Sequence, residues 1–287
     1  MARHEQQRRT RRPGGTVGRR NDEDDEIDLQ LHRAHSARMY DYYLGGTTNF
    51  AADREAAGQA IAVFPSARVA ARANRAFMHR STSTLAQAGI AQFLDIGTGI
   101  PTSPNLHEVA QAVNPQTRVL YTDNDPIVLA HARALLLSSP EGLTTYLQAD
   151  VTDPATILTS QELARTIDVT APVAMSLNAL LHFVPDDQDA YRIVEQLKNA
   201  LSPGSALVIS HGTPDFGPAE AERITQVYAA AGTTVRMRTR AQVERFFDGW
   251  DLLDPGICPT HRWRPNGADQ GITEAQVSAY AAVAVKR

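Results

Sequence analysis

Acidic and glycine residues with a spacing suited to ligand binding gather at positions 95–99. An apolar run ends there in Asp95, and Gly97 and Gly99 follow. A short apolar run bounded by turn residues is typical of a buried parallel strand. Glycines after such a strand let the backbone turn tightly and approach a ligand where a Cβ would clash. The next segment predicts a helix whose first N–H groups are free, so this stretch is a candidate nucleotide-binding turn.

A second acidic residue, Asp123, closes the next predicted strand and could accept hydrogen bonds from ribose hydroxyls. Dinucleotide-binding enzymes need G-x-G-x-x-G, whose turn faces a pyrophosphate. Here the first position is Asp95 and no third glycine follows Gly99. An acid would repel a pyrophosphate, but it suits the ammonium and sulfonium of S-adenosylmethionine (SAM). The D-x-G-x-G pattern thus resembles the first motif of class I methyltransferases.

Polar residues also close the later strands, where open parallel sheets bind their ligands. Asp150 could accept the adenine amino group while the Val151 N–H faces a ring nitrogen, and Asn178 could meet the methionine ammonium. Any one of these residues could instead cap a helix or close a turn. Their occurrence at successive strand ends favours cofactor binding. The predicted SAM ligands on the strand ends are Asp95, Gly97, Gly99, Asp123, Asn124, Asp150, Val151 and Asn178.

The pattern of elements after residue 90 alternates strand and helix, which predicts an α/β fold with a doubly wound parallel sheet. Strands are expected at 92–96, 118–122, 144–148, 173–177, 206–210, 250–253 and 277–286, and helices at 105–113, 125–137, 155–166, 187–201, 218–231 and 239–247.

The segment before the sheet, residues 31–90, predicts helices at 34–43, 53–63 and 67–88. Gly45, Pro65 and Gly89 stand where such helices end. We expect these helices to fold over the ligand edge of the sheet as a lid; the alternative is a collar that only packs. The expected organisation is a charged, disordered tail at 1–30, a helical lid at 31–90 and a SAM-binding domain at 91–287.

Composition excludes several classes of protein. The net charge of −4 gives no global case for nucleic-acid binding, and no apolar run reaches membrane-spanning length. The N-terminus lacks the apolar segment of a secretory signal. A single cysteine, Cys258, excludes an intramolecular disulfide and suits a reducing cytoplasm. The nine histidines form no metal-ligand motif, so we expect no metal site.

Beyond these motifs, the chain resembles the S-adenosyl methyltransferase family of actinomycetes, formerly catalogued as a domain of unknown function, over about residues 36–286. The resemblance rests on SARMYDYYLGG at 36–46, NFAADR at 49–54, ANRAF at 73–77, QFLDIGTG at 92–99, YTDNDP at 121–126, LHFV at 181–184, SH at 210–211 and WRP at 263–265. It implies a Rossmann-like class I fold with strand order 3-2-1-4-5-7-6, strand seven antiparallel, and a helical N-terminal addition. It implies no particular substrate.

Residues near the methyl acceptor are harder to identify, because methyl transfer needs no unique catalytic side chain. A base helps when the acceptor is a hydroxyl, and His182 and His211 follow strands four and five. Each could instead be a histidine bonded to backbone. Arg75 or Arg54 could pair with the methionine carboxylate. The candidates for closing over SAM or the acceptor are Tyr42, Asn49, Arg54 and Arg75.

Three functions remain open from the sequence. The first is a SAM-dependent methyltransferase acting on a small molecule, and the second is a catalytically inactive SAM-binding regulatory module. The third is an NAD(P)-dependent oxidoreductase, against which the missing third glycine and the position of Asp150 argue. An RNA or protein acceptor would need a basic groove, which the sequence does not indicate.

Overall fold

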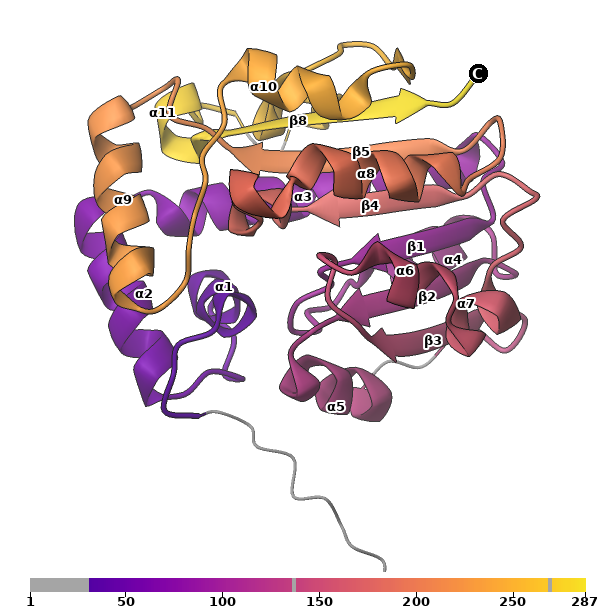
Figure 1. The fold of residues 1–287 in the computed structure, drawn as a ribbon, viewed down its shortest axis with the longest axis horizontal. Helices are drawn as coiled ribbons and strands as arrows, with labels where there is room; N and C mark the ends of the chain where they lie inside the picture. The colour runs from indigo at the N-terminus through magenta and orange to yellow at the C-terminus, as the bar shows by residue number, and fades with distance from the viewer. Residues whose placement is uncertain (1–30, 136–137, 268–269) are drawn as a thin grey trace, which may run out of the picture.

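The computed structural model of the chain describes residues 31–135, 138–267 and 270–287. The predicted tail at 1–30 lies outside these residues. The described part forms one sheet in the order β3-β2-β1-β4-β5-β8-β6, with β7 pairing with β8 off this path (Figure 1). The strands are β1 Gln92–Ile96, β2 Arg118–Asp123, β3 Leu143–Gln148, β4 Ala174–Asn178, β5 Ala206–Gly212, β6 Asp251–Leu252, β7 Cys258–Pro259 and β8 Ala279–Val285.

The directions of the strands and their order in the sheet both match the prediction. Strands β3, β2, β1, β4 and β5 are parallel to their neighbours, while β8 runs antiparallel to β5 and β6. The seventh predicted strand is β8, so the order 3-2-1-4-5-7-6 is confirmed. Strands buried on both faces need continuous apolar runs. The last strand, AYAAVAV, meets this need, and its five central residues are buried.

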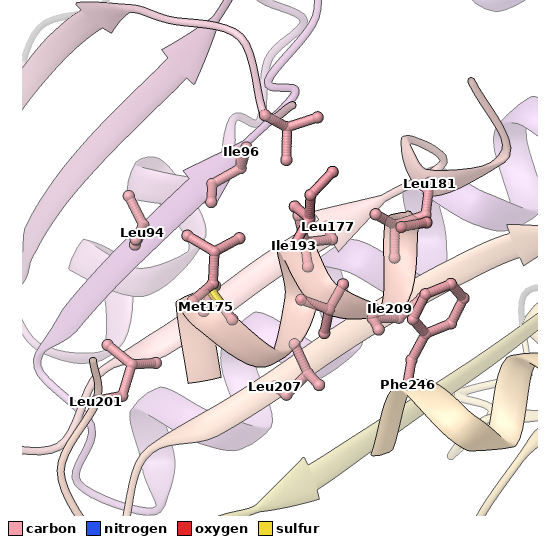
Figure 2. Close-up of a cluster of buried hydrophobic side chains, with 14 of the residues drawn as sticks. Leu94, Ile96, Met175, Leu177, Leu181, Ile193, Leu201, Leu207, Ile209 and Phe246 are labelled. Carbon is pink, nitrogen blue, oxygen red and sulfur yellow. The ribbon is translucent and has the colours of Figure 1, made fainter. Parts of the chain in front are cut away.

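Helices cover both faces of the sheet and its carboxyl edge (Figure 1). One core cluster joins α8 and the turn after α10 to the sheet, and a second joins α3 and α4 to the other face. Figure 2 shows part of the first, where Ile193 of α8 lies among Met175 and Leu177 of β4 and Leu207 and Ile209 of β5. The helices are α1 Ser36–Leu44, α2 Ala51–Val63, α3 Ala67–Gln87, α4 Leu106–Val113, α5 Pro126–Leu135, α6 Pro154–Leu158, α7 Gln161–Thr166, α8 Ala190–Asn199, α9 Pro218–Ala230, α10 Arg240–Glu244 and α11 Glu274–Val277.

Two predicted helices differ from the structure because a polar residue inside each predicted range caps the N-terminus of a helix that begins there. The segment expected as one helix at 155–166 is α6 and α7, since the Ser160 side chain accepts a bond from the Leu163 N–H and begins a new helix. The helix expected from 187 begins only at Ala190, after Asp189 has turned with φ 53° and capped it. The two-residue β7 and the short α11 were not predicted.

The three N-terminal helices pack against different parts of the molecule. Helix α3 packs against α4 and one face of the sheet. Helices α1 and α2 pack with α9 and with Ala67 and Ala71 at the start of α3 in another apolar cluster, beyond the carboxyl ends of the strands (Figure 1). The segment predicted as a lid therefore contributes one helix to the sheet layers and two helices to the edge where a ligand would bind.

Candidate functional site

A cavity of about 280 Å³ lies between the carboxyl ends of the strands and helices α1, α3 and α9. Cavities of roughly this size, with a few convergent polar groups, are typical of small-molecule sites. Every residue predicted to bind the cofactor lines it, including one from α3. These residues are Asp95, Gly97, Gly99, Asp123, Asn124, Asp150, Val151, Asn178 and Arg75.

The turn after β1 uses glycine at both predicted positions for a backbone reason. Gly97 and Gly99 have φ of 74° and 69°, a region that L side chains rarely adopt. A Cβ on Gly97 would come within 2.7 Å of the Leu180 side chain, whereas a Cβ on Gly99 would meet no atom within 4 Å. Gly99 thus exposes its backbone to open space beside the cavity, where a ligand can approach it closely.

Asp95 is buried at the end of β1. The Ser176 hydroxyl, on the adjacent strand β4, donates a hydrogen bond to its Oδ1. Burial raises the pKa of Asp95 to about 6, although the Ser176 bond and the charge of Arg75 oppose the rise. A carboxylate that lacks a strong cationic partner inside the protein is well suited to a cationic ligand group.

Asp123 links the second strand to the glycine turn. One carboxylate oxygen accepts the Gly99 N–H at 2.9 Å and the other accepts the Asp125 N–H at 3.0 Å. Burial raises its pKa, while these two bonds act in the opposite direction. Each carboxylate oxygen has a second lone pair, so the side chain is held in place and can still accept a ribose hydroxyl.

Asp150 lies at the end of the third strand with its neighbours already bonded to it. Asn124 donates to Oδ2 at 2.9 Å, and the Thr152 backbone N–H donates to Oδ1 at 2.8 Å. Burial raises the pKa of Asp150, but these bonds outweigh it and leave the pKa below its usual value. Val151 is buried beside it. This pair therefore offers an ionised carboxylate and an apolar wall, which fits an adenine ring and its amino group.

Three buried polar atoms on residues that line the cavity have no hydrogen-bond partner among the described residues: Asn178 Oδ1, Asn74 Oδ1 and Arg75 Nε. Buried polar groups are almost always paired in native proteins, so these atoms mark side chains at the cavity whose hydrogen-bonding capacity is not used within the described part of the protein. Amide oxygens accept bonds from an ammonium, and a guanidinium pairs with a carboxylate. These residues therefore fit the amino-acid end of SAM, and Asn74 is a candidate that the sequence analysis missed.

Arg75 is held by the loop that follows the glycine turn. One of its terminal nitrogens donates to the Thr102 carbonyl and, at 2.9 Å, to the Pro104 carbonyl. Burial lowers the pKa of Arg75, which nearby acids, including Asp95, partly counter. Arg75 lines the cavity, and its pairing with a ligand carboxylate stays a prediction.

The two candidate bases both line the cavity, but they are not equivalent. The Gly212 carbonyl accepts a bond from His211 Nδ1 at 2.7 Å, and Arg238 donates to His211 Nε2 at 3.0 Å. Both ring nitrogens are therefore occupied, and the geometry matches the backbone-bonded alternative rather than a free base. Burial, followed by repulsion from His182, lowers the pKa of His211 well below its ordinary value.

His182 keeps one ring nitrogen without a protein partner among the contacts of the described residues. Its Nδ1 accepts the Gly212 N–H at 3.4 Å, which assigns the proton of the neutral ring to Nε2. Burial and, secondarily, Arg238 lower its pKa to about 4, so the ring is neutral near pH 7. In this tautomer Nε2 is a donor, and a base role for His182 stays a prediction.

Arg238 holds His211 in place and was not singled out from the sequence. It is fully buried and donates to the carbonyls of Leu181 at 2.8 Å and Val184 at 3.0 Å. Arg238 also forms an ion pair with Asp186 at 2.9 Å. Nothing in the local sequence distinguishes this arginine from the exposed ones around it, because its partners come from a segment about 50 residues earlier in the chain.

Three of the four predicted lid residues do not line the cavity. Asn49 is buried and donates to Asp41 at 2.7 Å, and Arg54 donates to the Asn49 carbonyl at 2.6 Å. The Arg68 guanidinium lies 5.0 Å from the Tyr42 ring centroid. These contacts stabilise the loop between α1 and α2 and the packing of α1 on α3.

The α1 residues that do line the cavity are Ser36, Ala37, Tyr40 and Tyr43. Ser36, Tyr40 and Tyr43 are four and then three residues apart, the spacing of one face of a helix. The spacing was visible in the sequence, but the sequence did not say which face of α1 turns toward the sheet.

The described residues contain no cluster of three or more His, Cys, Asp or Glu that could hold a metal ion. None of the helices in the same described ranges has the length and apolar character needed to cross a membrane.

Comparison with known proteins places this site in a family. Two solved structures match most of the chain. A DUF574 family protein from Streptomyces avermitilis is 49% identical, with 90% of this chain and 100% of that chain covered and a TM-score of 0.88. A candidate methyltransferase from Thermobifida fusca is 37% identical, with 90% and 97% covered and a TM-score of 0.83. A search of curated proteins found no match.

A family model described as S-adenosyl methyltransferase matches residues 21–287, which include every cavity residue discussed above. The family's cofactor is the one that the strand-end residues fit, and the predicted Rossmann-like class I fold agrees with the observed sheet order. The chain therefore belongs to the S-adenosyl methyltransferase family, with S-adenosylmethionine as its cofactor.

Proposed function

We propose that this protein transfers a methyl group from SAM to a small-molecule acceptor bound in the same cavity. The main support for the proposal is that Asp95, Asn178 and Arg75 line one cavity together with Asp123 and Asp150 at the strand ends. These groups match an ammonium and a carboxylate held next to a cationic centre, which is the charge pattern of the methionine end of SAM.

The protein's part in such a reaction is mainly binding and orientation. When bound, SAM supplies a methyl group already activated by its sulfonium. A nucleophilic atom of the acceptor would bond to the methyl carbon as the carbon–sulfur bond breaks, sulfur would keep that electron pair, and any acceptor proton would leave to water or a base. Holding two reactants in line removes much of the entropic barrier.

We assign the lid role to α1 and α2, with α3 as part of the sheet layers. Support comes from the cavity-lining side chains of Ser36, Tyr40 and Tyr43 on α1 and from the packing of α1 and α2 on α9. Covering the cavity from this side would exclude water from the reacting atoms.

The interior of the cell is the location that the single cysteine favours.

Neither alternative function gains support from the family match. An NAD(P)-dependent enzyme would need a turn that accepts a pyrophosphate, but the buried Asp95 carboxylate lies at the start of the glycine turn and no third glycine follows Gly99. An inactive SAM-binding module would share the cofactor site. It would differ in failing to turn over when SAM binds and a suitable acceptor is present.

The test of the proposal is isothermal titration of the purified protein with SAM, S-adenosylhomocysteine (SAH) and NAD. SAM and SAH should bind and NAD should not. An Asp123→Ala variant should bind SAM at least about tenfold more weakly, because it loses a charged acceptor and frees the glycine turn. Asp168→Ala, at an exposed acid whose carboxylate accepts bonds from nearby Thr170, is the matched control and should bind SAM normally. Binding of NAD alone, or of none of the three, would show that the cofactor assignment is wrong.

A further inference from the structure

The helix-facing wall of the cavity is chemically different from the strand-end wall. Its side chains come from α1, the start of α3, α9, the turn after β4 and the segment between α9 and α10. We call this part the acceptor chamber. It is lined by Tyr43, Phe64, Ala67, Ala70, Ala71, Phe183, Ile224, Tyr228, Val235 and Met237.

The chamber is one continuous surface rather than scattered apolar residues. The His182 and Phe183 rings lie 4.4 Å apart, and the Phe183 ring is 5.8 Å from that of Tyr228. The hydroxyls of Tyr228 and Tyr43 are 3.2 Å apart. The series runs from the end of β4, next to Asn178, to the lid helix α1, so a molecule in the chamber would lie beside the methionine end of the cofactor.

Charged groups are divided unequally between the two walls. The strand-end wall holds Asp95, Asp123 and Asp150, and Arg75 lies beside it. On the helix side, His35 caps the start of α1, and its Nδ1 lies 3.2 Å from Asp125 Oδ2. The remaining charged lining group there is Glu220, which is half exposed and paired with Arg223 at 3.0 Å. Among the described lining residues, none places an unpaired cation or anion in the chamber.

The tyrosine pair supplies the chamber's neutral polar groups. Only one of the two hydroxyls can donate to the other, so the second proton and the remaining lone pairs are available to a ligand. Burial raises the pKa of both hydroxyls, so both stay protonated at neutral pH. A ligand hydroxyl or carbonyl could bond to this pair without carrying charge.

We infer that the methyl acceptor is an uncharged ring compound with a mostly apolar body and a neutral hydrogen-bonding group, bound in the acceptor chamber between α1, α3 and α9. The inference rests on the proposed function, because it takes the neighbouring cofactor to be SAM. A carboxylate or phosphate would be buried without a cation, and an ammonium without a free anion, and both are strongly unfavourable. Small alanines on α3 leave the width that a ring needs.

Three ligands that share one ring system but differ in charge test the inference directly. The protein is saturated with SAH, and 2-naphthol, 2-naphthoate and 2-naphthylmethylammonium are then titrated by fluorescence at pH 7.5. The neutral compound should bind at least about tenfold more tightly than either ion, because the ions lose hydration without gaining a partner.

A charge introduced into the chamber should change that order. Ala70 lies in the first turn of α3 and lines the cavity, so Ala70→Lys brings an ammonium to the wall without a helix-breaking residue. This variant should bind 2-naphthoate more tightly than 2-naphthol while keeping its SAH affinity. Ala62→Lys, on the exposed side of α2, is the matched control and should keep the wild-type order.

Two results separate this inference from the function on which it rests. If the wild-type protein binds SAH but binds naphthoate as well as naphthol, or binds none of the three compounds, the acceptor inference is overturned and the cofactor assignment stands. If SAH does not bind at all, the proposed function fails and the inference fails with it. Normal SAH binding with the expected order, reversed only in Ala70→Lys, supports the acceptor inference and the cofactor site on which it rests.

Discussion

The two walls of the cavity obtain their geometry in different ways. On the strand-end wall, side chains are fixed by nearby backbone: Asp123 accepts the Gly99 and Asp125 N–H groups, and Asp150 accepts the N–H of Thr152. On the helix wall, apolar faces of α1, α2 and α9 pack on one another and place tyrosines toward the cavity. The first wall therefore has a fixed arrangement of charged groups, as the proposed cofactor site needs, while the shape of the second depends on side-chain volume.

A buried ion pair joins the two walls. Arg38 of α1 has its Nε 3.2 Å from Asp125 Oδ2, without hydrogen-bond geometry, and lies 3.8 Å from Asp53 of α2. Both the Arg38 and Asp125 side chains are almost completely buried. Because the Asp125 N–H also bonds to Asp123, the position of the lid is connected to the residue expected to hold the ribose. A substitution at this contact therefore tests whether the helix wall affects the strand-end wall.

The largest effect is expected from Arg38→Met. Removing one partner of a buried pair takes the guanidinium away from Asp53 and leaves Asp125 with His35 alone as an ion-pair partner, which costs about 3–5 kcal/mol of unfolding free energy. Urea denaturation measures this loss, and SAH affinity should fall as well because the lid loses its anchor. The surface pair Arg262–Glu274, at 2.8 Å, provides the control: Arg262→Met should change stability by less than about 1 kcal/mol. Equal effects of the two variants would contradict the anchoring role of Arg38.

A smaller loss is expected from Gly97→Ala, which tests the strand-end wall. Its φ of 74° and the 2.7 Å approach of the added Cβ to Leu180 should cost about 1–3 kcal/mol and displace the turn that contacts the cofactor. Gly89→Ala shares a positive φ of 97° but has nothing within 4 Å and lies away from the cavity. Calorimetry should find reduced SAH affinity in Gly97→Ala alone; a similar reduction in both would place the effect in general stability.

The pH dependence of SAM binding distinguishes the walls by charge. Because burial raises the pKa of Asp95 to about 6, lowering the pH through 6 protonates this carboxylate and removes its attraction for the cationic ligand. SAM affinity should be constant above that pH and fall below it, approaching about tenfold per pH unit. Titration calorimetry between pH 5 and 8 gives the profile. Asp95→Asn should bind weakly at every pH with a flatter profile, and an unchanged slope would rule out Asp95 as the titrating group.

The smallest effect is expected in the helix wall. Tyr228→Phe leaves the Tyr43 hydroxyl without its partner and should lower the unfolding free energy by about 1 kcal/mol. The double variant Tyr43→Phe/Tyr228→Phe removes both hydroxyls, so its loss should be less than the sum of the single losses. Thermal or urea unfolding of the four proteins measures this coupling. SAH affinity should stay constant throughout, since the pair belongs to the other wall; a large loss of SAH affinity would place the tyrosines at the cofactor.

Prediction from the sequence succeeded where local patterns decide the outcome. The first strand was placed at Gln92–Ile96 and α9 to within one residue, because apolar runs and Pro or Gly stops are properties of neighbouring residues. Errors arose at short elements. The β7 bridge at Cys258–Pro259 forms only because β8 lies beside it, and a two-residue strand has no periodicity of its own.

The sequence by itself determined the strand-end wall of this protein. Each of its predicted ligand residues lies at or just after the carboxyl end of a strand, and parallel strands bring these ends to one edge of the sheet, so Asp95, Asp123, Asp150 and Asn178 had to meet. Only the tertiary structure decided the helix wall. A helix can turn any face inward, and packing on α9 and α3 directs Tyr40 and Tyr43 of α1 to the cavity. The long-range bond from Arg238 likewise fixes His211 in place, which no local pattern could indicate.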